Sequence, residues 1–111
     1  MNEKNVKDKV KKLCKEYGAY YAMPVMKGMA QNGTPDLLIC HRGLFIGCET
    51  KYKYGKPSAL QIARLHEIQR AGGIAVVINE RNIELLKRIF EREPGYQAEA
   101  GDTVPVEIPA P

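Results

Sequence analysis

Two acidic residues and one lysine, Asp36, Glu49 and Lys51, have the types and spacing of a small catalytic cluster. Asp36 begins one strand-like segment and Glu49 lies near the end of the next, with Arg42-Gly43 between them. If Arg42 and Gly43 are the central residues of a two-residue hairpin turn, paired positions sum to 85 and Asp36 lies opposite Glu49. Side chains alternate along a strand, so Lys51 shares the face of Glu49. The pattern predicts two carboxylates and an ammonium group on one face of a sheet.

Such a cluster needs a physical reason, because opposed acids repel and buried acids are costly unless they are paired or bound to a metal. A hard divalent cation such as Mg²⁺ supplies one, since it takes oxygen ligands from one or two carboxylates and keeps waters that can attack a phosphate. The prediction depends on the turn. Arg-Gly is a poorer two-residue turn than Asn-Gly, and a bulge would shift the register by one and send Glu49 to the other face.

Three helices and four strands are expected to position these residues, in the order αβββαβα. Apolar residues at helical spacing, with their end signals, predict helices at residues 3–17, 58–71 and 82–92. Apolar, strand-forming segments predict strands at residues 19–25, 36–41, 44–51 and 74–78. Both faces of the hairpin are largely apolar, which is typical of a sheet covered by helices. The expected fold class is α/β, with a mixed β-sheet flanked by helices.

The chain of 111 residues has the composition of one globular domain, which we place at residues 1–92. That part holds all 17 Lys and Arg and nine of the 13 acidic residues, a net charge of +8. Residues 93–111 carry four acids, no base and four prolines, and we expect this tail to be disordered or peripheral. The basic body predicts a polyanionic partner.

The sequence lacks the patterns of a membrane protein, a secreted protein and a zinc site. No apolar run approaches the roughly 20 residues that span a bilayer, and the first residues lead into lysines rather than a signal peptide, so a cytoplasmic protein without membrane contact is expected. Cys14, Cys40 and Cys48 lack metal-ligand spacing and are predicted to be reduced and mostly buried. His41 has no second ligand near it in the sequence, which disfavours a zinc site.

An ordered set of motifs resembles the PD-(D/E)xK nuclease superfamily, and within it the small stand-alone VRR-NUC nucleases. The set is Gly33-Thr34-Pro35-Asp36, Glu49-Thr50-Lys51, Ser58 with Gln61, and Ala71-Gly72-Gly73, over about residues 3–79. The resemblance implies a restriction-endonuclease-like core and an Mg²⁺- or Mn²⁺-dependent endonuclease that hydrolyses DNA, with no organic cofactor. It also implies branched DNA such as a four-way (Holliday) junction as substrate. A homodimer is expected, since one subunit carries one metal site and symmetric cutting of two strands needs two.

The resemblance assigns a role to each residue of the cluster. Asp36 and Glu49 would bind the metal through their carboxylates, with the Thr50 carbonyl as a main-chain ligand. Lys51 would position or polarise the attacking water and stabilise charge on the phosphate. It would act as the base itself only if it gave up its proton near neutral pH.

Two further residues have alternative interpretations. Glu3 matches a glutamate of the first helix that completes the metal site in the family, but an acid there is also favoured by the helix dipole. Gln61 would face the active site beside Lys51, or would form the second half of a capping box with Ser58.

Basic and aromatic residues next to Lys51 are candidates for nucleic-acid binding, because phosphate contacts and base stacking need these types. The candidates are Tyr52, Lys53, Tyr54, Lys56 and, in the preceding loop, Lys27. The alternative is a solvated loop. The Met-rich loop from Met23 to Met29 is a candidate for the dimer interface or for adaptation to DNA.

Two competing functions remain at this point. The first is a noncatalytic nucleic-acid-binding module that keeps the fold and the basic surface. The second is a purely structural subunit, which is disfavoured because it gives no reason for Asp36, Glu49 and Lys51 to converge.

Overall fold

The computed structural model describes residues 2–25 and 32–92. The expected order αβββαβα is confirmed, with the elements α1 Glu3–Glu16, β1 Tyr20–Ala22, β2 Leu37–His41, β3 Leu44–Thr50, α2 Ala59–Arg70, β4 Ile74–Ile78 and α3 Ile83–Phe90. Three predicted features lie outside the described residues: the acidic tail, Lys27, and most of the Met-rich loop. Within the described parts, no helix has the length and apolarity needed to cross a membrane.

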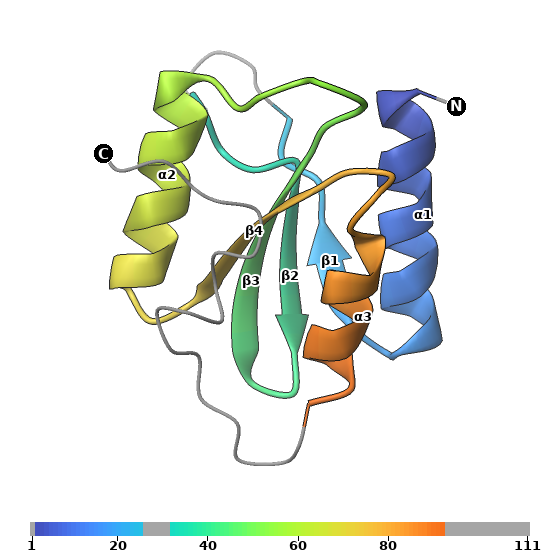
Figure 1. Cartoon of the computed structure of the whole chain (residues 1–111). Helices are drawn as coiled ribbons and strands as arrows, with labels where there is room; N and C mark the ends of the chain where they lie inside the picture. Colours follow the sequence, from blue (N-terminus) through green and yellow to red (C-terminus); the bar gives the residue numbers. More distant parts are fainter. Residues whose placement is uncertain (1, 26–31, 93–111) are drawn as a thin grey trace.

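The four strands form one mixed sheet in the order β1-β2-β3-β4. β1, β2 and β3 pair antiparallel, whereas β3 and β4 are parallel and α2 crosses between them (Figure 1). β4 is buried along its whole length, as its unbroken apolar run predicted. The sheet is therefore mixed and flanked by helices, as expected.

The β2–β3 hairpin has the predicted register. Its pairs run from Leu37 opposite Cys48 to His41 opposite Leu44, so every pair sums to 85. Arg42 and Gly43 have φ angles of 50° and 82°, the two positive values that a two-residue turn of type I′ requires. The hairpin closes without a bulge, so Glu49 keeps its predicted place beside the residue that precedes β2.

Helices cover both faces of the sheet, with α1 and α3 on one side and α2 on the other (Figure 1). β4 contributes to both cores by alternation: Ile74, Val76 and Ile78 belong to the α1–α3 core, and Ala75 and Val77 pack beneath α2. Of the three free cysteines, Cys14 and Cys48 are buried as predicted, and Cys40 is exposed.

Three strands are shorter than the sequence-based prediction, and each helix is shorter by one to three residues. β1 covers only Tyr20–Ala22, because Pro24 lacks the N–H that a longer strand would use. β2 begins at Leu37, so Asp36 lies one residue before the strand. β3 ends at Thr50, although the N–H of Lys51 still donates to the carbonyl of Ile78 at 2.9 Å.

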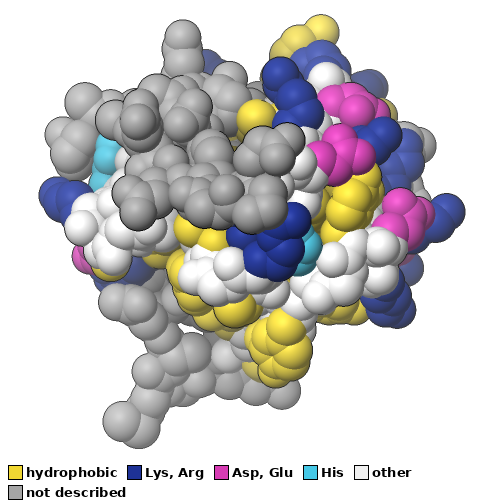
Figure 2. Space-filling view, turned by 90° about the horizontal axis from the view of Figure 1, so that it is seen from below, with side chains coloured by type: hydrophobic (Ala, Val, Ile, Leu, Met, Phe, Trp, Pro, Cys, Tyr) yellow, Lys and Arg dark blue, Asp and Glu magenta, His cyan; other side chains and the backbone are white. Residues whose placement is uncertain are grey.

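The hairpin turn is held by the end of the last helix. Arg92 donates to the carbonyl of His41 and lies 2.9 Å from its Nδ1, while Arg42 donates to the carbonyl of Arg92 at 2.6 Å. His41 is buried against the ring of Phe90. Figure 2 views this end of the molecule, where basic side chains border a histidine.

Candidate active site

The candidate site lies at the end of the sheet opposite the hairpin turn, where β2 begins and β3 ends (Figure 1). The backbone N–H of Asp36 donates to Glu49 Oε1 at 3.2 Å. Asp36 Oδ2 in turn accepts hydrogen bonds from Thr50, from its backbone N–H at 3.0 Å and from its hydroxyl at 2.7 Å. Each acid is thus held by the strand segment that carries the other, which is a direct result of the hairpin register.

Lys51 completes the cluster. Its Nζ lies 3.2 Å from Glu49 Oε2, and its side chain is only 16% exposed. The hydrogen bond from its backbone to Ile78 extends the parallel pairing with β4 past the end of β3. The structure therefore brings Asp36, Glu49 and Lys51 together.

Glu49 has an unusual electrostatic environment, because its side chain is 1% exposed. Burial first, and the charge of Asp36 second, raise its pKa from 4.5 to about 7. The positive charge of Lys51, 3.2 Å from Oε2, and the hydrogen bond from the Asp36 N–H lower the pKa in part. Near neutral pH this carboxyl is close to the point of losing its proton, and a nearby cation would favour its ionised form.

The oxygens at this site fit a hard divalent cation. Glu49 Oε2 is buried and, although it lies close to the charge of Lys51, it has no partner in hydrogen-bond geometry among the described residues. Asp36 adds a half-buried carboxylate beside it. In the described ranges no three acidic, His or Cys side chains gather into a metal-binding group. The protein ligands here would be two carboxylates, a set that suits Mg²⁺ or Mn²⁺ with bound waters.

Three other residues were predicted to belong to the site: Thr50, Gln61 and Glu3. Thr50 is fully buried, and it holds Asp36 through its N–H and hydroxyl. Gln61 forms the capping box with Ser58: its Oε1 accepts from the Ser58 N–H at 2.8 Å, and Ser58 Oγ accepts from the Gln61 N–H at 3.2 Å. Glu3 is exposed in the first turn of α1 and is not brought into a group of three with Asp36 and Glu49.

Sequence reasoning missed Lys7, whose Nζ lies 3.9 Å from Asp36 Oδ1. The available signal was its place directly after buried Val6 on α1, at the border of the apolar stripe. Lys7 also follows Glu3 by four residues, so the two share one side of the helix. α1 therefore presents a cation, and one turn earlier an acid, on the side that faces Asp36.

The segment after Lys51 presents rings and cations at its surface. Tyr52 is half-buried and packs against the core, and Lys53 Nζ lies 5.7 Å from the centre of its ring. Tyr54 is 88% exposed, and Lys56 is exposed. Of the residues predicted to contact nucleic acid, Lys53, Tyr54 and Lys56 are thus exposed and follow the acidic cluster in the chain.

No protein-family model matches the sequence, and no curated protein sequence matches it. The structure is similar to that of Hjc from Archaeoglobus fulgidus, a Holliday junction resolvase from an archaeal hyperthermophile, with a TM-score of 0.53 at 15% sequence identity. The match covers 68% of this chain and 66% of that chain. The four-stranded mixed sheet with its flanking helices is thus a resolvase-like fold, as the predicted restriction-endonuclease-like core required.

Proposed function

We propose that this chain is a divalent-metal-dependent endonuclease that hydrolyses phosphodiester bonds in branched DNA, four-way junctions included, and that it acts as a homodimer. The observation that carries the proposal is the buried carboxylate of Glu49, which lies between Asp36 and Lys51. Burying an acid beside a second acid destabilises a protein unless something binds it. A catalytic cation accounts for this cost, and a purely structural role does not.

Asp36 and Glu49 are the residues that would hold Mg²⁺ or Mn²⁺. The bound cation would neutralise phosphate charge and make a coordinated water more acidic. Thr50 keeps one Asp36 oxygen in place with two hydrogen bonds, and the Asp36 N–H orients Glu49 in turn. Both carboxylates are therefore preorganised by neighbouring backbone, which is the requirement for a site that must not rearrange during reaction.

Lys51 supplies a positive charge beside Glu49. We assign it to stabilise the negative charge that grows on the phosphate and to orient the attacking water. Its backbone is tied to β4 and its side chain is mostly buried, so the ammonium group has little freedom to leave the site. Lys7 reaches the site from α1 and would add a second cation near Asp36.

Three finer assignments extend this proposal. Glu3 would complete the metal site from the helix side that also carries Lys7. Gln61 uses its Oε1 in the cap, so it would act through its amide Nε2. Tyr52, Lys53, Tyr54 and Lys56 would contact the DNA backbone and bases. The likeness of the fold to Hjc supports a branched substrate, because that protein is a Holliday junction resolvase. A dimer would supply the two metal sites that symmetric cutting of two strands needs.

The test is a cleavage assay on duplex, flap and four-way-junction DNA, with Mg²⁺, Mn²⁺ or EDTA. Wild type is expected to cut the junction only with metal, and Lys51→Ala to lose at least about a hundredfold in rate, as when one group that stabilises a transition state is removed. Arg88→Ala, which removes an exposed cation on α3, is the matched control and should cut at the wild-type rate.

Other outcomes separate the alternatives. Junction binding without cleavage, unchanged by Asp36→Ala, would establish the noncatalytic module. Cleavage that persists in EDTA would refute the metal-dependent mechanism. Sedimentation of the protein with and without junction DNA tests the dimer, and a monomer under both conditions would remove that part of the proposal.

A further inference from the structure

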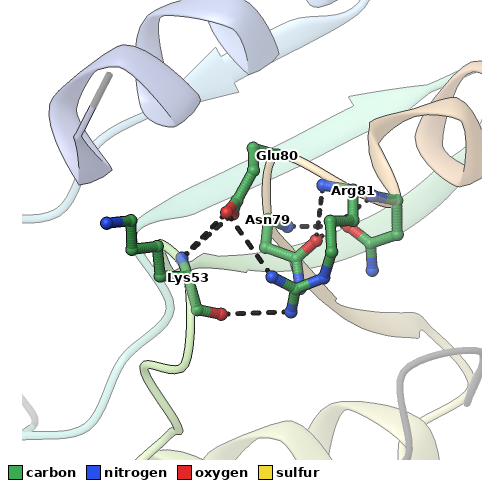
Figure 3. A network of polar contacts seen from close by, with 5 residues as sticks. Lys53, Asn79, Glu80 and Arg81 are labelled. Atoms are coloured by element: carbon green, nitrogen blue, oxygen red, sulfur yellow. Dashed lines mark hydrogen bonds and ion pairs between the residues drawn. The ribbon is translucent and has the colours of Figure 1, made fainter.

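Two consecutive residues between β4 and α3 hold the backbone of Lys53 at both of its polar groups. The Lys53 N–H points at the carboxylate of Glu80, at 3.0 Å from Oε1 and 3.1 Å from Oε2. Arg81 Nη2 donates to the Lys53 carbonyl at 3.0 Å (Figure 3). We call this arrangement the Glu80–Arg81 clip.

The clip rests on a rigid base. Asn79 Oδ1 accepts from the N–H groups of Arg81 and Asn82 at 2.8 and 3.1 Å, and Asn82 Oδ1 accepts from the N–H of Asn79 at 2.7 Å. Asn82 Nδ2 also donates to the Val77 carbonyl at 2.8 Å. The connection that presents Glu80 and Arg81 is thus tied to the end of β4, next to the strand that carries Glu49.

Lys53 needs this support because its backbone has a φ of 53°. This left-handed conformation costs a residue other than glycine on the order of 1 kcal/mol, and it persists where surrounding contacts over-determine it. The clip supplies those contacts on both sides of the residue. The conformation also places Lys53 Nζ against the ring of Tyr52.

The charge of Glu80 matches this role. Burial would raise the pKa of Glu80, but hydrogen bonds from its own N–H and that of Lys53, with the charges of Arg81 and Lys53, lower it below the usual value. Arg81 Nη1 also lies 3.5 Å from Glu80 Oε2. An ionised acid whose charge is shared in this way repels a nearby phosphate less than a free one would.

We propose that Glu80 and Arg81 are positioning residues. They hold Tyr52 and Lys53 in the conformation in which these two residues contact the DNA backbone beside the scissile phosphate. The proposal rests on the proposed nuclease function. Lys51 is anchored to Ile78, the last residue of β4, and Lys53 is anchored to Glu80 and Arg81 in the connection that follows β4. The catalytic lysine and the backbone-binding segment are therefore set at a fixed distance along one rigid support.

The test compares Glu80→Ala, Glu80→Gln and Lys53→Ala in junction cleavage and in junction binding by fluorescence anisotropy. Glu80→Ala is expected to raise KM and the dissociation constant about five- to tenfold and to leave kcat within about twofold, because binding is affected and the metal site is not. Glu80→Gln keeps an oxygen that accepts from the Lys53 N–H and should recover most of the affinity. Glu84→Gln, an exposed acid in the first turn of α3, is the matched control and should bind as wild type.

Two measurements separate positioning from mere stability. Hydrogen exchange of the Lys53 amide should be slow in wild type and fast in Glu80→Ala. The double variant Glu80→Ala/Lys53→Ala should lose less affinity than the sum of the two single losses, since residues that act through one another are not additive. Additive losses, or a lower melting temperature with unchanged KM and affinity, would overturn the proposal.

Failure of the nuclease proposal gives a different result. If wild type binds the junction but cuts none of the DNA substrates, the anisotropy measurements alone decide the positioning role. Weaker binding by Glu80→Ala, with recovery in Glu80→Gln, would still support it. Unchanged binding would refute it.

Discussion

The backbone N–H of Asp36 donates to the Glu49 carboxylate at 3.2 Å, so two residues with like charges are joined by a main-chain hydrogen bond. The bond follows from the hairpin register, because Asp36 and Glu49 are the next residues beyond its last pair, Leu37 opposite Cys48. It partly offsets the repulsion between the carboxylates, and Lys51 offsets more from the other side. The Asp36 N–H and the Lys51 charge thus compensate in part for the burial of Glu49.

Glu49→Gln should separate stability from function. At pH 8 in EDTA, the variant is expected to unfold with a free energy about 1–3 kcal/mol larger than wild type, because burying a neutral amide costs less than burying a carboxylate. The same variant should lose metal-dependent cleavage. Urea unfolding and the junction assay measure the two effects, and a less stable variant would show that Lys51 more than compensates for the buried charge.

Thr50→Val tests how far Asp36 must be held in place. The change removes the hydroxyl that lies 2.7 Å from Asp36 Oδ2 and keeps the size of the side chain. We expect kcat to fall about tenfold and stability by about 1 kcal/mol, the usual value of one such hydrogen bond. Thr50→Ser retains the hydroxyl and should restore most of kcat. Equal rates for the valine and serine variants would mean that the Thr50 N–H alone suffices.

Gly33→Ala tests the segment that leads into Asp36. Gly33 has a φ of 81°, and an added Cβ would lie 2.9 Å from the backbone oxygen of Leu60 in the first turn of α2. The predicted loss of unfolding free energy is about 2–4 kcal/mol, from left-handed strain together with displaced packing. Gly18→Ala is the control, because its φ is 68° but nothing lies within 4 Å of the new atom. Similar losses in both variants would show that close packing on α2 is unimportant.

His41 should make stability depend on pH. Burial first, and the charge of Arg92 next, lower its pKa from the ordinary 6.5, although a hydrogen bond with the Tyr17 carbonyl opposes them. The unfolded chain therefore takes up a proton at a higher pH than the folded one. The stabilisation is present above about pH 6.5 and is lost as the pH falls through the lower folded pKa.

Urea midpoints between pH 7.5 and 5 measure this effect. Glu49, whose pKa is raised, contributes the opposite trend to both proteins, so the result is the difference between them: from pH 7.5 to 5, wild type should lose stability relative to His41→Gln. His66→Gln, which removes the histidine of α2, is the control for the loss of an imidazole. If the stabilities of His41→Gln and wild type change in parallel with pH, the histidine carries no linkage to folding.

Local patterns accounted for most of the fold. Apolar spacing located the helices and the buried strand β4, and the Arg42-Gly43 turn set the hairpin register. The short β1 and the position of Asp36 outside β2 were not predicted, because strand ends depend on hydrogen-bond partners elsewhere in the chain. For Gln61 the capping interpretation is confirmed, since the bond joins residues only three positions apart.

By itself, the sequence determined which residues could do chemistry and that Asp36 and Glu49 would lie close together. The reason is that a two-residue turn at Arg42-Gly43 fixes which positions pair across the hairpin. The tertiary structure decided how deeply Glu49 is buried, that Lys7 reaches Asp36, and that Glu80 and Arg81 hold Lys53. These contacts join residues 27 or more positions apart. No local pattern encodes them, since they arise only when helices and strands pack and exclude water from between them.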